Sequence, residues 1–422
     1  MSKHRRKPKI RQESPSRTVT VEVPVALLST LRYARNALFE LCLETGQQTL
    51  MKLMEEDRTL LCGPKDKHQA DRRAYRYGYA PSEVTLGGRR IPIPRPRVRS
   101  AEGAELALPT FQAVADRDPL DDHTMAAIVA GVSTRQYAST LEPLPAALSE
   151  RSTSRSSVSR RFVALTAAQM DRWLHQRIDD LGIRIVMVDG KVFRDHVVLI
   201  VLGIAENGRK YVLGLREGTT ENATVCRALL SELIERGLPT DRRLLFVIDG
   251  GKGIRAGIRE CFGREAIVQR CLTHKERNVL EHLPPSMRSS CQSALKRAWK
   301  SKDAKLARRQ LEQLARGLEA KHAGAAASIL EGLDEQLTLQ RLGIDGALAR
   351  VLRTTNAIEN LMGSVQRYTR NVKRWRGGKM ILRWVGAAVL HAQRSFRGLH
   401  GQSDIPMLVR ALQDVDLEEI AA

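Results

Sequence analysis

Two apolar runs, each closed by an aspartate and a glycine, decide the fold: IRIVMVDG at residues 183–190 and LLFVIDG at residues 244–250. Each run predicts a buried strand that delivers a carboxylate, Asp189 or Asp249, to its C-terminal end, where the glycine allows a sharp turn. The C-terminal edge of such strands is where α/β proteins place their chemistry. In a strongly cationic chain, two carboxylates at that edge indicate a divalent metal and a phosphate substrate.

The segments around these runs predict a mixed sheet. An Asn-Gly pair at residues 207–208 stands between two β-rich runs and predicts a hairpin. The expected elements are strands over 192–193, 196–204 and 211–215, a helix over 220–237 capped by Thr220, a helix over 254–262 and a strand over 266–270. This element order matches an RNase H-like core, which has three strands in a meander followed by a helix, a strand, a helix and a strand. We therefore expect an α/β fold whose five-stranded mixed sheet has flanking helices and acids on its central strands.

The composition indicates a nucleic-acid partner. The 422 residues include 69 Lys and Arg against 47 Asp and Glu, which gives a formal charge of +22 and a pI near 10.2. A polyanion relieves self-repulsion of this size, and nucleic acid is the usual one. Aromatic residues make up only 4% of the chain, which argues against recognition of single strands by base stacking alone.

Membrane insertion and disulfide frameworks are not expected. No apolar run approaches the roughly 20 residues that span a bilayer. The basic N-terminus, residues 2–11, is not followed by the hydrophobic stretch of a secretory signal. The six cysteines are scattered without a Cys-x-x-Cys element, so we expect reduced thiols in a cytoplasmic protein and no structural zinc module.

Composition and periodicity divide the chain into seven regions. Residues 1–20 are a basic, disordered tail, and residues 21–115 are an N-terminal DNA-binding region with a helix over 23–61 and irregular β-structure. The remaining regions are a helix-turn-helix-like DNA-binding region at 116–178, the first part of the RNase H-like core at 179–275, a helical insertion at 276–350, the C-terminal helices of the core at 351–400, and a tail at 401–422.

Two stretches before the core have the residue types of DNA contacts. In residues 72–99, basic side chains and prolines are interleaved with three tyrosines, which fits DNA contact and fits a solvated edge hairpin equally well. Arg155, Arg160 and Arg161 lie where a serine-rich turn leads into a helix over 162–174. This arrangement suits a recognition helix in the major groove, and an ordinary helical bundle is the alternative.

A third acid is needed to hold two metal ions through protein oxygens, and Glu359 is the candidate. It is the only acid among residues 351–400, which carry ten Lys and Arg. A lone carboxylate among cations is often a surface ion-pair residue, but an apolar stripe places this one near the buried face of a helix: Ile358, Leu361, Met362 and Val365. The cations after it are candidate DNA contacts: Arg367, Arg370, Lys373, Arg374 and Arg376.

Together these elements resemble the bacterial Mutator-type (MULE-related) insertion-sequence transposases. The resemblance covers about residues 70–395 and rests on Asp189 in VDG, Asp249 in a hydrophobic-Asp-Gly context, Cys-Leu-Thr-His at 271–274 and Thr-Thr-Asn-Ala-Ile-Glu-Asn at 354–360. GVSTR at 131–135 and SSVS at 156–159 also fit the N-terminal half of that family. Order and spacing make the set specific, since 60 residues separate the two aspartates and 110 separate Asp249 from Glu359.

The resemblance implies a DDE transposase in which Asp189, Asp249 and Glu359 are both the catalytic residues and the metal ligands. It implies two Mg²⁺ ions, with Mn²⁺ as a substitute, and cleavage and strand transfer at the terminal inverted repeats of an insertion sequence. Hydrolysis and joining are one phosphoryl substitution with different nucleophiles, so one site serves both. The implied partners are double-stranded DNA, both terminal repeats and target, and a second copy of the chain, because two element ends must meet. No nucleotide cofactor is expected, since the sequence has no GxxxxGK[ST] loop.

Two interpretations of Cys271 and His274 stay open. A Cys-x-x-His pair could be half of a zinc site, but no second pair has suitable spacing, so we do not expect a metal site here. The two residues are either a packed pair at the end of the last strand or, as the family position implies, a site where His274 contacts DNA. Two other functions also stay open: an RNase H-fold nuclease or integrase that cuts without joining, and a DNA-binding regulator whose acids are inert. The expected location is the bacterial cytoplasm, in association with the nucleoid.

Overall fold

The computed structural model describes residues 27–67, 74–86, 89–115, 128–129, 131–132, 136–137, 155–218, 222–263 and 266–414, with only the backbone for residues 27–40 and 157. The chain divides into two compact units. The first comprises residues 1–121 and 139–153, and the second comprises residues 122–138 and 154–422. The predicted tail at 1–20 and most of the predicted helix-turn-helix segment before residue 155 lie outside the described residues.

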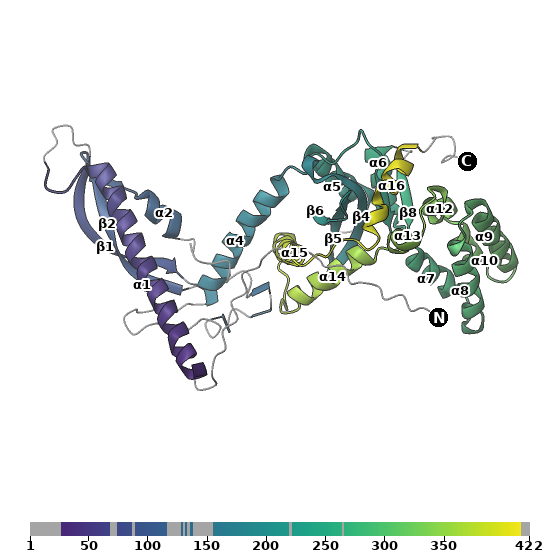
Figure 1. Ribbon diagram of the computed structural model, residues 1–422, viewed down its shortest axis with the longest axis horizontal. Helices are drawn as coiled ribbons and strands as arrows, with labels where there is room; N and C mark the ends of the chain where they lie inside the picture. Colours follow the sequence, from purple (N-terminus) through teal and green to yellow (C-terminus); the bar gives the residue numbers. More distant parts are fainter. Residues whose placement is uncertain are drawn as a thin grey trace, which may run out of the picture. The chain divides into compact units, whose positions relative to one another are not determined.

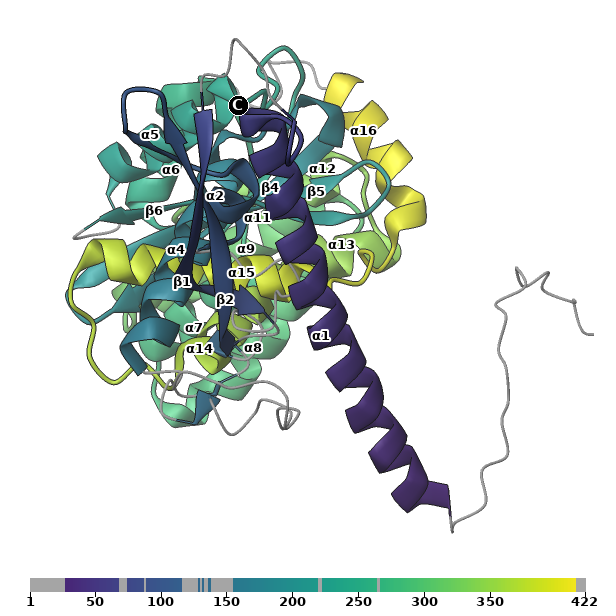
Figure 2. The same cartoon turned by 90° about the vertical axis from the view of Figure 1, so that its left-hand side faces the viewer.

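The first unit is a long helix on a small antiparallel sheet (Figure 2). Helix α1, Leu27–Cys62, confirms the helix predicted over 23–61. Strands β1 (Ala74–Leu86) and β2 (Arg89–Ser100) form a hairpin, β3 (Glu105–Leu106) pairs with β2, and α2 (Pro109–Ala115) follows. The apolar core of this unit includes Leu50, Met54, Val84, Ile93, Val98 and Leu108. The β-structure predicted for this region is therefore confirmed.

The second unit is built on a five-stranded mixed sheet of order β6-β5-β4-β7-β8. The strands are β4 (Ile183–Phe193), β5 (His196–Ala205), β6 (Lys210–Gly218), β7 (Leu245–Ile248) and β8 (Ile267–Arg270). The first three form an antiparallel meander, with the predicted Asn-Gly hairpin between β5 and β6, and β7 and β8 run parallel to β4. Helix α5 (Ala223–Glu235) leads to β7, and α6 (Lys252–Phe262) leads to β8. The predicted element order is confirmed.

Two details of these elements differ from the prediction. Strand β4 does not end at Asp189 but continues to Phe193, because the residues after the aspartate extend the ladder with β5. Only Gly250, with a φ of 104°, makes the left-handed turn expected after an aspartate. The predicted cap of α5, Thr220, lies outside the described residues, and Asn222 caps this helix by accepting a 2.9 Å hydrogen bond from the N–H of Val225.

Helices cover both faces of the sheet (Figure 1). Helices α5 and α6 pack on one face, through apolar residues such as Leu229, Leu233 and Ile254. The other face carries α4 (Arg155–His175), α14 (Asn356–Thr369), α15 (Gly378–Gln393) and α16 (Ile405–Asp414). Successive residues of β4 alternate between these two layers, as Val186 and Met187 do.

A helical segment lies between β8 and α14. Helices α7 (Leu272–Glu281), α8 (Pro285–Lys300), α9 (Ala304–Glu319), α10 (Ala323–Leu330) and α11 (Leu333–Gln336) share an apolar cluster of their own. Helices α12 (Thr338–Arg341) and α13 (Gly346–Leu352) then return to the sheet, where Leu339 and Leu348 join its core. The sequence is mostly helical here, as predicted.

The ends of this unit correct two expectations. The predicted tail at 401–422 is wrong for residues 405–414, which form α16 and bury Ile405, Leu408 and Leu412 against the sheet. Helix α4 begins at Arg155, earlier than predicted, and Trp173 donates a 3.1 Å hydrogen bond from Nε1 to the carbonyl of β6 residue Val212. The short helices η2 (Asp179–Leu181) and η3 (Gln402–Asp404) complete the unit. None of the helices in the described ranges has the length and apolarity to cross a membrane.

Candidate active site

The two predicted aspartates lie at neighbouring positions on one edge of the sheet. The last pair in the parallel ladder between β4 and β7 comes directly before Asp189 and Asp249. Both residues are half-buried. Each accepts a 2.8 Å hydrogen bond on Oδ1 from a nearby backbone N–H, that of Gly190 for Asp189 and that of Gly251 for Asp249. Backbone bonds therefore orient both carboxylates at this edge.

Glu359 lies in the first turn of α14, the helix that contacts β4. Its carboxylate stays accessible, with 39% of the side chain exposed. Lys191 donates from Nζ to Oε1 of Gln366 at 3.4 Å, which links α14 to the part of β4 that follows Asp189. The apolar stripe predicted around Glu359 is buried in the core of the sheet, as expected: Ile358, Leu361, Met362 and Val365.

Hydrogen bonds connect Glu359 to the end of β7. The hydroxyl of Thr355, the residue before α14, donates to Oε1 of Glu359 at 2.5 Å. The backbone N–H of Thr355 donates to Sγ of Cys271 at 3.4 Å. The N–H of Cys271 in turn donates to the carbonyl of Ile248, the residue before Asp249, at 2.8 Å. Thr355 was not predicted as a site residue, although it stands in the Thr-Thr-Asn stretch one helical turn before Glu359.

His274 lies in the first turn of α7, close to the acids. Its Nδ1 is 3.8 Å from Oε1 of Glu359 and 3.4 Å from Oγ1 of Thr355. The pKa of His274 is raised, chiefly by its hydrogen bond with the Cys271 thiol, against the effect of burial and with help from the negative charges of Glu359 and Asp249. Two of the three predicted acids thus act on the same imidazole. A contact between His274 and DNA stays a prediction.

Cys271 comes directly after β8 and is fully buried. Burial alone raises the pKa of its thiol, but hydrogen bonds with His274 and Thr355 outweigh that effect and the net pKa is lowered. Within the part of the chain that the structure describes, one set of three His, Cys, Asp or Glu residues has its ligand atoms within 4.8 Å of one another, and that set is Cys271, His274 and Glu359. The carboxylate oxygens of the three predicted acids, Asp189, Asp249 and Glu359, do not all lie within this distance of one another.

Arg270, the last residue of β8, connects the turn after Asp249 to the helical segment. Its side chain is buried, and it donates from Nη2 to the carbonyl of Gly250 at 3.1 Å and from Nη1 to the carbonyl of Glu331 at 3.2 Å. Lys275, which is fully buried, donates from Nζ to a carbonyl and a carboxylate oxygen of Glu331, each at 3.1 Å. Two buried cations therefore share one acid next to the Asp249 turn, and no sequence signal predicted this arrangement.

The predicted DNA contacts differ in exposure. All five on α14 and the loop that follows are exposed: Arg367, Arg370, Lys373, Arg374 and Arg376. On α4, Arg155 and Arg160 are also exposed. The structure corrects the expectation for Arg161, which is only 7% exposed because it lies on the buried face of α4 beside Phe162. DNA binding by the exposed residues stays a prediction.

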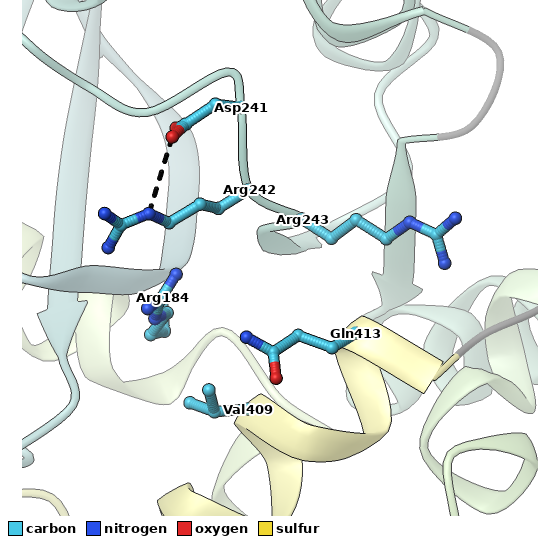
Figure 3. Close-up of a pocket in the computed structure, with 6 residues that line it drawn as sticks. All are labelled: Arg184, Asp241, Arg242, Arg243, Val409 and Gln413. Atoms are coloured by element: carbon cyan, nitrogen blue, oxygen red, sulfur yellow. Dashed lines mark ion pairs between the residues drawn. The ribbon is translucent and has the colours of Figure 1, made fainter.

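A second group of arginines lines a pocket of about 240 Å³ at the opposite ends of β4 and β7 (Figure 3). Arg184, at the start of β4, pairs with Glu206 at 2.5 Å, and Arg242 pairs with Asp241 at 3.6 Å. The third arginine of the pocket, Arg243, points away from the other labelled side chains (Figure 3). Because two of its cations are matched by acids, this pocket is a weaker candidate site than the edge that carries Asp189 and Asp249.

Comparison with known proteins identifies relatives over most of the chain. Residues 29–397 match the family "Transposase, Mutator family". The chain is 26% identical over 356 residues, or 80% of its length, to the transposase for insertion sequence element IS256 in transposon Tn4001 from Staphylococcus aureus, of which 86% is covered. It is also 26% identical over 219 residues to the transposase for element IST2 from Acidithiobacillus ferrooxidans, which covers 52% of this chain and 73% of that protein. A third relative, the transposase for element IS6120 from Mycolicibacterium smegmatis, is 31% identical over 42% of this chain and 53% of its own.

Proposed function

The chain belongs to the Mutator family of transposases, and we propose that it is a DDE transposase that cleaves DNA at the terminal inverted repeats of an insertion sequence and joins the ends to target DNA. Its relatives are insertion-sequence transposases, which indicates insertion-sequence transposition and DNA binding for this chain. One observation carries the proposed mechanism: Asp189 and Asp249 follow the last ladder pair of β4 and β7, and Glu359 lies on the helix that contacts β4. An RNase H-like core with a helical insertion is part of the same proposal.

The donor set suits Mg²⁺. Asp189, Asp249 and Glu359 offer only carboxylate oxygens, which are the ligands this hard cation prefers, and Mn²⁺ is an expected substitute. Two such ions, if held by these carboxylates, would activate the attacking hydroxyl and stabilise the leaving oxygen of an in-line displacement. Backbone N–H groups orient the aspartates, and the Thr355 hydroxyl orients Glu359.

The surrounding cations are the proposed DNA contacts. The exposed residues from Arg367 to Arg376 follow Glu359 along the chain, so they hold the phosphate backbone on the flank of the reacting phosphodiester. His274, whose Nδ1 lies 3.8 Å from Oε1 of Glu359, is a proposed DNA contact at the same edge. Two element ends must be brought together, so a homodimer is the proposed form, and no nucleotide cofactor is proposed. The proposed location is the bacterial cytoplasm, in association with the nucleoid.

The test is incubation of labelled element ends and a target plasmid with the full-length protein and Mg²⁺ or Mn²⁺. We expect nicked ends and strand-transfer products, both lost in Asp189→Asn, Asp249→Asn and Glu359→Gln. Arg242→Gln, an exposed position at the opposite end of the strands, is the matched control and keeps both products. Nicks without joining would favour a nuclease, and unchanged activity of the three acid variants would favour a DNA-binding regulator with inert acids.

A further inference from the structure

Three side chains at this edge offer the donor set of a second kind of metal. Cys271 supplies sulfur, His274 nitrogen and Glu359 oxygen, and the three ligand atoms lie within 4.8 Å of one another. The gap between Nδ1 of His274 and Oε1 of Glu359 is 3.8 Å. In a tetrahedral zinc site, bonds of about 2.0–2.3 Å place neighbouring donors roughly 3.3–3.7 Å apart. The gap between His274 and Glu359 therefore needs to close by only about half an ångström to hold one ion, and the sulfur of Cys271 lies within 4.8 Å of both donors.

The hydroxyl of Thr355 lies close to all three donors. Oγ1 of Thr355 lies 2.5 Å from Oε1 of Glu359, 3.3 Å from Sγ of Cys271 and 3.4 Å from Nδ1 of His274. Cys271 and His274 are three residues apart at the start of α7, a spacing that puts both side chains on one face of the helix. The sulfur is buried, but the side chains of His274 and Glu359 are 26% and 39% exposed, which gives an ion access from solvent.

We propose that Cys271, His274 and Glu359 bind a thiophilic divalent cation of the Zn²⁺ class, and that this ion inhibits the transposase by taking Glu359 away from the catalytic acids. Sulfur and nitrogen donors select Zn²⁺ over Mg²⁺, which favours all-oxygen sites. Three protein ligands leave the fourth tetrahedral position to water. The inhibition rests on the proposed function, whereas the binding of the ion does not.

Co²⁺ is the probe for binding, because it occupies zinc sites and reports its ligands by absorption. The full chain, with any purification tag removed, is titrated with Co²⁺ in the absence of DNA and Mg²⁺. We expect about one equivalent to bind with a thiolate-to-Co²⁺ charge-transfer band and the visible bands of four-coordinate Co²⁺, and Zn²⁺ to displace it. Absence of the charge-transfer band in the unsubstituted protein overturns the site.

Variants assign the ligands. Cys271→Ser removes the charge-transfer band, and Cys291→Ser, at another buried cysteine outside the cluster, keeps it. A band that persists in Cys271→Ser overturns the site. Because that substitution is in the core, circular dichroism checks the fold, and Glu359→Gln on a partly exposed side chain gives an independent test. Glu359→Gln weakens Co²⁺ binding by at least about tenfold, as loss of a direct ligand should, and unchanged affinity in this variant contradicts the proposal.

Inhibition is measured on element ends in excess Mg²⁺. Zn²⁺ at the concentration that saturates the Co²⁺ site is expected to suppress cleavage in the unsubstituted protein and in Cys291→Ser alike. Half-inhibition of the residual activity of His274→Ala requires about tenfold more Zn²⁺. Binding of Co²⁺ without inhibition by Zn²⁺ overturns the inhibitory role. Absence of cleavage in Mg²⁺ alone contradicts the proposed function instead, while the spectra still establish the metal site.

Discussion

The hydroxyl of Thr355 donates a 2.5 Å hydrogen bond to Oε1 of Glu359, one helical turn further along the chain. Thr355 is fully buried and also contacts Cys271 and His274, so its own rotamer is fixed by the elements around it. The bond therefore fixes the direction of a carboxylate that is otherwise partly exposed. Partners of this kind orient metal ligands, and their loss costs about 10–100-fold in metal affinity or activity.

Replacing Thr355 with valine tests this role, because valine keeps the shape and removes the hydroxyl. We expect Thr355→Val to raise the Mg²⁺ concentration for half-maximal DNA cleavage by about 10–100-fold. Thr355→Ser keeps the hydroxyl and should restore the Mg²⁺ dependence of the unsubstituted protein. The measurement is cleavage rate over a Mg²⁺ titration, with thermal melts to confirm folding. Identical Mg²⁺ curves for the valine variant and the unsubstituted protein would show that Glu359 needs no such partner.

Gly250, directly after Asp249, is expected to tolerate no side chain. Its φ is 104°, and a Cβ there would lie 2.2 to 2.5 Å from the guanidinium atoms of Arg270. Gly250→Ala should lower the melting temperature and abolish cleavage, because Arg270 would have to release the carbonyl beside the aspartate. Gly263→Ala is the control, since its φ of 80° is also positive but there is open space around the new methyl group.

Both alanine variants place a Cβ on a backbone with positive φ, which costs about 1–3 kcal/mol at each position. Any further loss of stability in Gly250→Ala measures the clash with Arg270. Melting temperatures and cleavage rates are compared for both proteins. Equal shifts in melting temperature, together with equal cleavage, would refute the contact between Arg270 and the Asp249 turn.

The pH dependence of the free energy of unfolding should show how much the charge of Glu331 stabilises the protein. Burial acts to raise the pKa of its carboxyl, but Lys275 and Arg270 outweigh burial and hold the pKa below the usual 4.5. A carboxyl with a lower pKa in the folded state adds stability above its unfolded pKa and loses it as the pH falls through the folded value. The difference in unfolding free energy between the unsubstituted protein and Glu331→Gln should be complete at neutral pH and shrink below pH 4.5.

Urea unfolding at a series of pH values measures that difference. The comparison with Glu331→Gln removes the contributions of all other acids, which titrate in both proteins. A difference that stays constant from neutral pH down to well below 4.5 would mean that Glu331 does not stabilise the two buried cations through its charge.

The sheet and two of its acids could be predicted from the sequence because their signals are local. An apolar run that ends in an aspartate specifies both a buried strand and the position of its carboxylate, and parallel pairing of β4 with β7 then brings Asp189 and Asp249 to one edge. The Asn-Gly pair specifies the hairpin by its turn geometry alone. Glu359 could be placed on a helix face by its apolar neighbours, which the structure confirms as buried.

Thr355 and Arg270 could not be predicted, because their roles depend on contacts between distant segments. In the sequence, a threonine before a helix indicates an N-cap. The bond of Thr355 with Cys271, however, joins residues 84 positions apart. The sequence indicates only that Arg270 ends a strand, because its partner Glu331 lies 61 residues away. The exposure of Arg161 was predicted wrongly for a related reason. Which face of α4 this residue occupies depends on how the helix packs, and in the structure Arg161 is only 7% exposed.

The exposed cations after Glu359 should govern the salt dependence of DNA binding. Each phosphate contact on a duplex contributes about 0.9 to the slope of log affinity against log salt concentration. Arg370→Gln with Arg374→Gln is therefore expected to weaken binding to element ends and reduce that slope by about 1.8. Arg242→Gln, at the ion-paired pocket, should leave the slope unchanged. Arg161→Gln should lower the stability of the protein but leave the salt slope unchanged, because the Arg161 side chain is buried. Filter binding or fluorescence anisotropy over a salt series measures the slopes. A larger change in slope for Arg161→Gln than for the double variant would indicate that DNA contacts α4 and not α14.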